Sequence, residues 1–402
     1  QAITVETPST TARRRTRLST DAWIEDPMTN SPWIKSLQRS FVDHFYSIYL
    51  GATAGDWMRE LRRNRFVVSP RHWARAAYVT AGSPVNSLAA AITDRKFRAA
   101  CDATRVSRPV FVLGHWRSGT TYLQRLFSLD SRLGYPTTYE VMAPRVFPLL
   151  EKSTRSWYDA FMPPDRVFDR MTISFADPAE DEFAVALLCG LSPCLSWLFP
   201  RNRAFYDRFL TLRNATADER RTWKESLDAF LRMLTMYCGK PLVLKSPAHT
   251  GRVRLLLEMY PDAKFVHIHR DPYRVFSSTC NMVRFMQSLG FQSDDGAAVE
   301  DLVLSWYQEV HQAFWEDRDL LSSDQFVEIS YRDLTADPRG TMEQIYGRLG
   351  LGGIEHFRPE LDQYLSSIKG YETNKLPEIA SPWRERIGRE CRRVFQEWGY
   401  TA

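Results

Sequence analysis

Short apolar runs alternate with helical patterns through much of the chain after residue 107. The first run, "RPVFVLG" at 108–114, predicts a buried strand, and residues 119–129 predict a helix after it. The same order recurs three times, with strands at 241–246, 263–270 and 325–331 and helices at 251–260, 272–286 and 338–349. Apolar strands that alternate with helices predict an α/β fold of three layers, in which helices cover both faces of a parallel sheet.

The residues before the first strand have a different pattern. Residues 1–30 are rich in Thr, Ser and Arg and predict a loose polar arm, whereas residues 33–103 are helical in pattern, with breaks expected at Gly and Pro. We therefore predict an arm at 1–30, an N-terminal helical layer at 31–106 and a main domain at 107–402. Two interpretations of the layer stay open. It packs on the main domain, which we favour, or it makes peripheral contact with a membrane or lines an entrance for apolar substrates.

Composition narrows the class of protein. The chain has 402 residues, of which 44% are hydrophobic, and no apolar run approaches the roughly 18 residues of a membrane span. The basic start has no apolar segment behind it, so we do not expect a secretory signal. Six cysteines without a CxxC pair favour reduced, buried thiols in a cytoplasmic protein over disulfides or a zinc site. A net charge of +5 is too mild to predict nucleic-acid binding.

The loop after the first predicted strand has the features of an anion site. In "GHWRSGTT", Gly114 and Gly119 allow the backbone to wrap closely around an anion, and the next helix supplies free N–H groups. Arg117 adds a cation, and Thr120 and Thr121 add hydroxyl donors. The loop resembles a nucleotide-triphosphate loop but has Thr120 where that loop has Lys. By itself the pattern is also compatible with an ordinary turn between strand and helix.

A second candidate anion site follows the third predicted strand. In "FVHIHRDPYRVFSS", Arg270 ends the strand, and Ser278 follows eight residues later on the next helix. The carboxyl ends of parallel strands lie at one edge of a sheet, where ligands bind. The two side chains are therefore candidates for a second phosphate, although a helix cap at Asp271 with exposed Arg and Ser would give the same pattern.

Together these segments resemble the 3′-phosphoadenylyl-sulfate (PAPS)-dependent sulfotransferases, which have a P-loop-like fold. The resemblance covers residues 108–400 in motif order, and it is closest to a bacterial branch through "LGHWRSGTT", "LVLKSPAHTGR" and "HIHRDPY". It implies that the loop binds the 5′-phosphosulfate and that Arg270 and Ser278 bind the 3′-phosphate, with Tyr331 beside the adenine. The loop residues concerned are Arg117, Ser118, Gly119, Thr120, Thr121 and Tyr122. The chain departs from the family in having Trp116 where Pro is common and Arg117 where Lys is common.

The resemblance also implies an activity. A sulfuryl group would move from PAPS to a hydroxyl acceptor, or alternatively an amine, by in-line displacement that releases PAP. The acceptor would be a small molecule, a lipid or a glycan. Arg117 and Lys245 are the cations expected on the leaving side, where Lys245 matches the family's active-site Lys. We expect no metal, because no carboxylate ends a strand as a magnesium ligand and no His/Cys cluster is present.

The general base stays open between a histidine and several glutamates. His249 leads, because it follows Lys245 in the loop where an acceptor would approach, although the family's histidine follows its Lys by two residues rather than four. The acidic run "DPAEDEFA" offers Glu180, Asp181 and Glu182 as alternatives, and Glu140, in "PTTYEVMAP", is a further one.

Two other functions fit parts of the pattern. A P-loop kinase or NTPase would share the loop, but it needs Gly-Lys-Ser/Thr and a metal-binding Asp, which are missing. A catalytically inactive nucleotide-binding scaffold would keep the same motifs. Turnover of PAPS with a panel of hydroxyl acceptors separates these functions from sulfuryl transfer.

Overall fold

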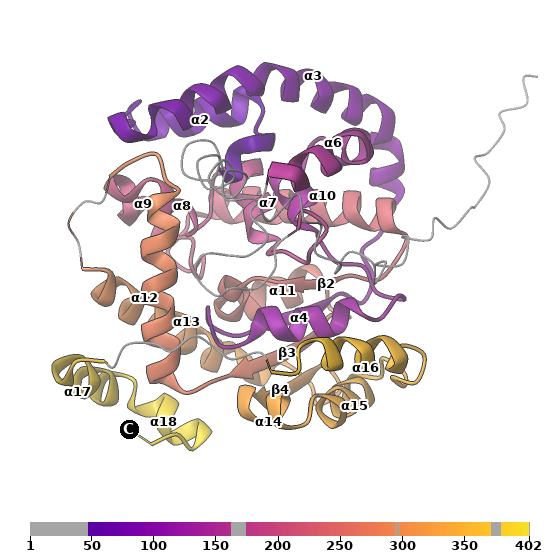
Figure 1. The fold of residues 1–402 in the computed structure, drawn as a ribbon, viewed down its shortest axis with the longest axis vertical. Helices are drawn as coiled ribbons and strands as arrows, with labels where there is room; N and C mark the ends of the chain where they lie inside the picture. Colours follow the sequence, from indigo (N-terminus) through magenta and orange to yellow (C-terminus); the bar gives the residue numbers. More distant parts are fainter. Residues whose placement is uncertain (1–46, 162–173, 294–295, 297, 371–378, 402) are drawn as a thin grey trace, which may run out of the picture.

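A four-stranded parallel sheet lies at the centre of the main domain (Figure 1). The computed structural model describes residues 47–161, 174–293, 296, 298–370 and 379–401. The strands are β1 Val110–Leu113, β2 Val243–Lys245, β3 Lys264–His269 and β4 Phe326–Ser330, in the order β2-β1-β3-β4. All four predicted strands are therefore confirmed, each within three residues of its predicted ends.

Both faces of the sheet are buried, which confirms the three-layer α/β prediction. Alternate residues of β1 point to opposite faces: Phe111 belongs to one core cluster and Val110 to the other. The first face packs against α10 Ala217–Cys238 and α11 Val253–Met259. The second packs against α4 Thr120–Ser128, α15 Pro338–Leu349 and α16 Arg358–Ser367.

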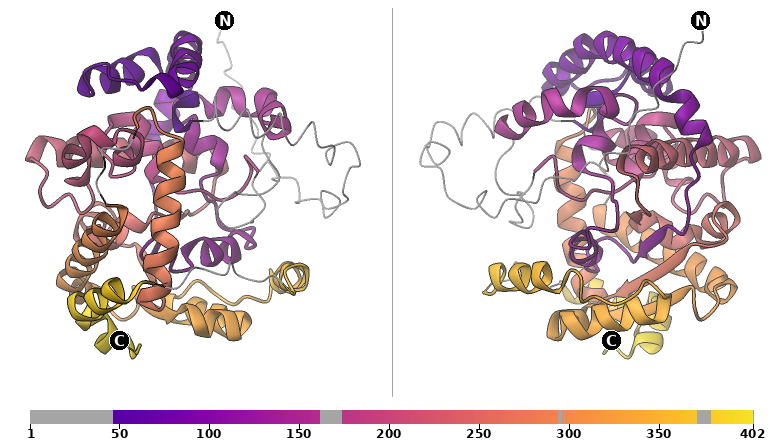
Figure 2. Two further views of the ribbon diagram at one scale, coloured as in Figure 1. Left: turned by 60° about the vertical axis from the view of Figure 1, so that its left-hand side comes forward. Right: turned by 90° about the vertical axis from the view of Figure 1, so that its right-hand side faces the viewer.

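The remaining elements surround these layers (Figure 2). Between α4 and β2 the chain forms α5 Thr138–Met142, α6 Phe147–Phe161, α7 Glu182–Cys189, α8 Leu195–Leu198, η4 Pro200–Asn202 and α9 Arg203–Asp207. Later elements are η5 Pro247–Arg252, α12 Pro272–Ser288, α13 Val299–Asp317, η6 Arg318–Leu320, α14 Tyr331–Ala336, α17 Ser381–Glu390 and α18 Arg392–Trp398. All six cysteines are free thiols.

The N-terminal helices include one that is longer than predicted. They are η2 Ile48–Gly51, α2 Ala54–Arg63, η3 Pro70–His72 and α3 Trp73–Ala103, and the predicted helical residues 33–46 lie outside the described residues. The expected break in the last of these was wrong, because α3 continues through Gly82 and Pro84. A proline leaves the carbonyl four residues earlier without its helical donor. Here Ser83 Oγ donates to that carbonyl, Thr80 O, at 3.0 Å.

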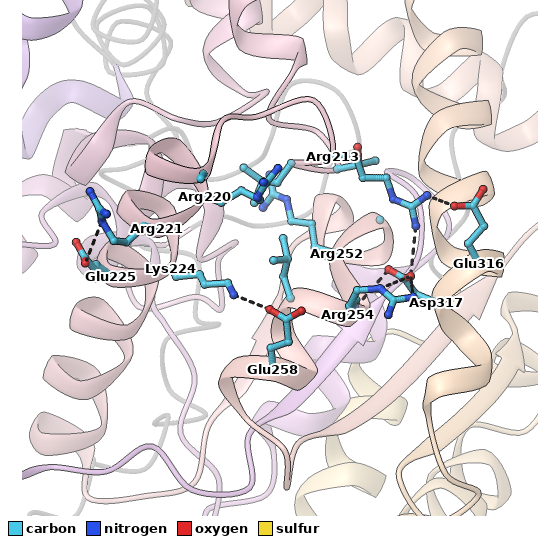
Figure 3. Close-up of a pocket in the computed structure, with 15 residues that line it drawn as sticks. Arg213, Arg220, Arg221, Lys224, Glu225, Arg252, Arg254, Glu258, Glu316 and Asp317 are labelled. Carbon is cyan, nitrogen blue, oxygen red and sulfur yellow. Dashed lines mark hydrogen bonds and ion pairs between the residues drawn. The ribbon is translucent and has the colours of Figure 1, made fainter.

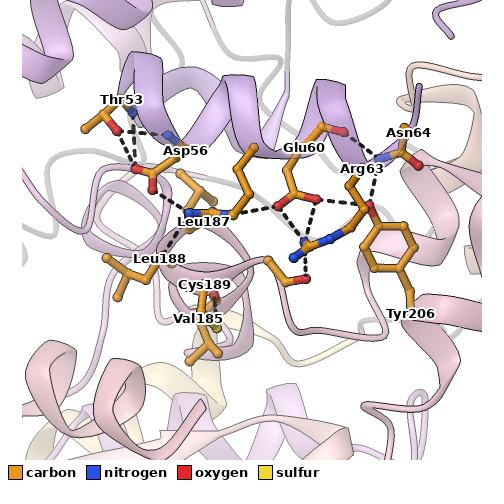
Figure 4. Close-up of polar contacts among 12 residues, drawn as sticks. Thr53, Asp56, Glu60, Arg63, Asn64, Val185, Leu187, Leu188, Cys189 and Tyr206 are labelled. Carbon is orange, nitrogen blue, oxygen red and sulfur yellow. Dashed lines mark hydrogen bonds and ion pairs between the residues drawn. The ribbon is translucent and has the colours of Figure 1, made fainter. Parts of the chain in front are cut away.

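Helix α2 is tied to α7 by buried polar contacts (Figure 4). Arg59 Nη2 donates to Leu187 O at 2.7 Å, and Arg63 Nη1 donates to Gly190 O at 2.9 Å. Both arginines also pair with Glu60, a fully buried carboxylate that accepts a third bond from a tyrosine hydroxyl. Carbonyls at a helix C-terminus lack partners within the helix. The arginines of α2 therefore cap the C-terminus of α7, whose first residue is Glu182.

Candidate active site

The loop between β1 and α4 has a backbone that only certain residues adopt easily. Gly114, Arg117 and Gly119 have φ of 141°, 69° and 110°. A Cβ at Gly119 would come within 2.3 Å of Tyr331 Cδ2, and one at Gly114 within 2.5 Å of Ile268 O. The loop therefore packs so closely on the ends of β3 and β4 that glycine is required at both positions.

Contacts with two other segments hold this loop. Gly114 N donates to Thr250 Oγ1 at 2.7 Å, and Thr279 Oγ1 donates to Trp116 O at 3.2 Å. The Trp116 side chain is buried. The loop is thereby fixed to η5 and to α12 before any ligand binds.

The loop and the start of α4 fit an anion. Ser118 Oγ is buried and has no hydrogen-bond partner among the described residues. Gly119 precedes α4 without a side-chain cap, and the first turn of α4 has no acidic residue. The N–H groups at Thr120, Thr121 and Tyr122 lie in that first turn, where an anion is favoured. These features fit the phosphosulfate end of PAPS.

The structure brings together the residues expected to bind the rest of the nucleotide. Arg117 Nε donates to Ser278 Oγ at 2.9 Å, and Arg270 Nη1 donates to Arg117 O at 3.4 Å. The Arg270 guanidinium lies 4.1 Å from the centre of the Tyr331 ring. Burial lowers the pKa of Arg270, and the charges of Arg117 and Arg274 lower it further. An arrangement of adjacent guanidiniums favours an anionic ligand.

Lys245 lies beside the loop, at the end of β2. It pairs with Val112 of β1 in the sheet register, which places it next to the start of the loop. Its Nζ donates to Glu180 Oε1 at 2.8 Å; the Lys side chain is 4% exposed and the Glu side chain 16% exposed. The sequence offers Glu180 as an alternative base only together with Asp181 and Glu182, because nothing local distinguishes the three.

His249 is enclosed in the core rather than open to an acceptor. Its side chain is fully buried between the rings of Phe111 and Trp223, and its Nε2 lies 2.5 Å from Asp181 Oδ2. Burial alone would raise the pKa of Asp181, but the nearby His249, and to a smaller extent Lys245, hold it below its usual value.

Two of the glutamates predicted as alternative bases, Glu182 and Glu140, have structural partners. Glu182 is fully buried and binds Arg252 through both carboxylate oxygens, at 2.6 and 3.1 Å. Glu140 is also fully buried and forms a capping box at the start of α5, where its Oε2 accepts from Thr137 N at 2.7 Å. Neither carboxylate is exposed to an incoming hydroxyl in this arrangement.

A separate cavity of about 710 Å³ lies between α10, α11 and the end of α13 (Figure 3). Many of its charged side chains pair with one another: Lys224 with Glu258 at 2.6 Å, and both Arg213 and Arg254 with Asp317. None of the predicted cofactor residues lines it. The cavity is therefore not the nucleotide site.

Two negative findings concern the described part of the chain. None of its helices combines the length and apolar character needed to cross a membrane. Within the same residues, no group of three or more His, Cys, Asp or Glu side chains could hold a metal ion.

Comparisons with known proteins show which family the chain belongs to. A model of the sulfotransferase family matches residues 109–355. Two omega-hydroxy-beta-dihydromenaquinone-9 sulfotransferases, from Mycobacterium bovis and Mycobacterium tuberculosis, are 34% identical over 355 residues, which is 88% of this chain and 91% of each relative.

Solved structures show the same fold. Sulfotransferase STF9 from Mycobacterium avium matches with a TM-score of 0.66 at 20% identity, covering 94% of this chain and 98% of that one. Sulfotransferase STF1 from Mycobacterium tuberculosis matches with a TM-score of 0.58 at 19% identity, covering 90% and 93%. The chain belongs to the sulfotransferase family, and it is an enzyme that transfers a sulfuryl group from PAPS to an acceptor and releases PAP.

Proposed function

We propose that the acceptor is a lipid that carries a hydroxyl group, and that the enzyme meets it at a membrane surface through its N-terminal helices. Support comes from the relatives at 34% identity, which are named for a hydroxylated dihydromenaquinone. The relatives support a small-molecule or lipid acceptor for this enzyme, and a hydroxylated lipid is our more specific proposal.

The nucleotide site is assigned to the residues that the structure brings together. Arg270 and Ser278 would hold the 3′-phosphate and Tyr331 would lie by the adenine, because these side chains cluster around Arg117. The phosphosulfate would lie on the loop and the first turn of α4, bound by Arg117, Ser118, Gly119, Thr120, Thr121 and Tyr122. The single observation that carries this assignment is the Arg117–Ser278–Arg270–Tyr331 cluster beside an uncapped helix start.

Two cations are placed to assist the transfer. Bound PAPS supplies an activated sulfuryl group, and negative charge grows on the phosphate that leaves. Lys245 lies beside the loop and Arg117 is part of it, and both cations would stabilise that charge more in the transition state than in the ground state. The close ion pair with Glu180 holds the Lys245 side chain in place.

For the general base we propose Glu180 in place of His249. The three consecutive acidic residues at 180–182 each contact a basic side chain of the β2–η5 segment. Among these three acids, Glu180 is the one whose side chain is partly exposed. A base must reach the acceptor hydroxyl. His249 would then be a positioning residue whose contact with Asp181 holds the acidic run against Lys245.

The test of the acceptor compares alcohols with PAPS as donor. Turnover is measured with a long-chain isoprenoid alcohol, a short-chain alcohol and a sugar, and we expect kcat/KM to be highest for the isoprenoid alcohol. Lys245→Met serves as the low-turnover reference. Its matched control is Lys264→Met, which changes a lysine at the amino end of β3, away from the carboxyl ends of the strands. Arg270→Ala should raise the KM for PAPS while leaving the order of acceptors unchanged. A preference for the sugar would contradict the lipid proposal.

A further inference from the structure

Exposed hydrophobic side chains are concentrated in one part of the surface. The described residues expose six large hydrophobic side chains, and five of them fall between residues 66 and 92. These five are Phe66, Trp73, Val85, Leu88 and Ile92, with exposed fractions from 46% to 66%. The sixth, Leu320, lies in η6. Single exposed hydrophobics are normal on protein surfaces, whereas a continuous group of them indicates a binding surface.

Helix α3 lies at the periphery of the molecule (Figures 1 and 2) and carries a stripe of exposed apolar side chains. We call the stripe the outer face of α3; it consists of Ala77, Ala81, Val85, Leu88 and Ile92, all exposed and spaced three or four residues apart. A surface helix usually carries polar residues on its outer side. Here the solvent side is apolar, whereas the buried side includes Arg75, Ser83 and Thr93.

Charged side chains are absent from the middle of this surface. Between Trp73 and Thr93 the one charged residue is Arg75, which is fully buried and donates through Nη1 to Gly290 O at 2.7 Å. The charges that flank the stripe are mainly basic. Exposed residues are Arg62, Arg65 and Arg71 before it, and Arg95, Lys96 and Arg98 after it, with Asp94 paired to Arg98.

The turn before α3 presents another apolar side chain through an unusual backbone. Arg65 and Phe66 have φ of 54° and 58°, a conformation that favours glycine, yet Phe66 is 58% exposed. Such strain persists only where the surrounding structure maintains it, and it concentrates at functional sites. Nearby, the exposed Trp73 donates through Nε1 to Val68 O at 3.2 Å, which leaves its apolar ring facing outward.

We infer that the outer face of α3, with Phe66 and Trp73, docks on an anionic lipid bilayer. An apolar helix face with basic residues at its edges is the pattern that binds a membrane interface, where the apolar side chains enter the acyl region and Lys and Arg meet anionic headgroups. A second copy of the chain fits less well, because both ends of the stripe are basic and would oppose each other in either orientation. The inference rests on the proposed lipid acceptor. Docking on the bilayer would bring the enzyme to that lipid.

The test measures binding of the full chain to vesicles by co-sedimentation. We expect binding to vesicles of phosphatidylcholine with phosphatidylglycerol, weaker binding to phosphatidylcholine alone, and weakening by salt. Leu88→Asp should lower the partition coefficient at least about tenfold, because burying one leucine changes affinity on that scale. The matched control is Leu320→Asp, which adds the same charge at an exposed leucine outside the stripe and should bind like the wild type.

Several outcomes would overturn the inference. These are absence of binding to either vesicle, an equal loss in both variants, or a dimer in sedimentation that Leu88→Asp dissociates without any vesicle binding. Failure of the proposed acceptor gives a different result: vesicle binding would persist while turnover preferred a water-soluble acceptor. Turnover of a short-chain alcohol should be the same in Leu88→Asp as in the wild type, which shows that the variant is folded.

Discussion

At the scale of single residues, the acidic run at 180–182 shows how neighbours in sequence acquire different roles. Asp181 and Glu182 are fully buried and each is held by a buried partner, whereas Glu180 lies at the border between Lys245 and solvent. This difference comes from long-range pairing with residues more than 60 positions later, not from any local pattern.

The corresponding prediction concerns the proton acceptor. Glu180→Gln should lower the single-turnover rate by roughly 10²–10⁴-fold, the usual contribution of a positioned base, with little change in PAP affinity. Glu258→Gln is the matched control, because Glu258 also pairs with a lysine, at 2.6 Å, but outside the site. The rate is measured by rapid quench with the enzyme in excess over PAPS. If Glu180→Gln is fully active and folded His249→Ala is inactive, the histidine is the base.

The cluster proposed as the nucleotide site was easier to predict than the contacts of Lys245. Arg117, Ser278, Arg270 and Tyr331 follow strand ends of one parallel sheet, so their convergence could be expected from the order of strands. The partners of Lys245 could not, because an ion pair between distant segments leaves no periodicity in the sequence.

At the scale of elements, the strand–loop–helix unit from β1 to α4 depends on close packing against β4 and α14. Gly119→Ala should lower PAP affinity at least about tenfold, since its Cβ would overlap the Tyr331 ring and its φ is strained for alanine. The measurement is calorimetric titration with PAP. Gly239→Ala is the control: it has φ of 66° but nothing within 4 Å, so it should cost stability and leave PAP affinity unchanged. Equal affinities in the two variants would contradict the role of Gly119.

Element types were predictable where the apolar pattern was strong. The four strands follow from apolar runs that are buried on both faces. The length of α3 did not follow, because Ser83 supplies a donor to the carbonyl that Pro84 leaves unpaired, and a rule based on Pro alone misses that compensation. The division at residues 30 and 106 stays a prediction.

At the scale of the whole molecule, stability should depend on Asp207. Burial, with a smaller contribution from the charge of Glu309, raises the pKa of Asp207 from 3.8 to about 7. The folded protein therefore keeps a proton that the unfolded chain releases, so this carboxyl lowers stability as pH rises from about 4 to about 7. Asp207→Asn should remove that loss.

The measurement is urea unfolding of both proteins at about pH 5 and about pH 8. Relative to the wild type, Asp207→Asn should gain free energy of unfolding at the higher pH. A difference between the two proteins that is the same at both pH values would show that Asp207 does not titrate in this range.

The caps that Arg59 and Arg63 provide for α7 affect whether the main domain can be separated from the N-terminal helices. The family match begins at residue 109, so α2 lies outside it, yet two of its side chains satisfy the last carbonyls of the helix that carries the acidic run. A transplanted or truncated main domain would leave those carbonyls at the C-terminal end of α7 without the arginine donors. The segment that the family shares therefore lacks two of the contacts that complete α7 in this protein. Chimeras should be joined upstream of α2.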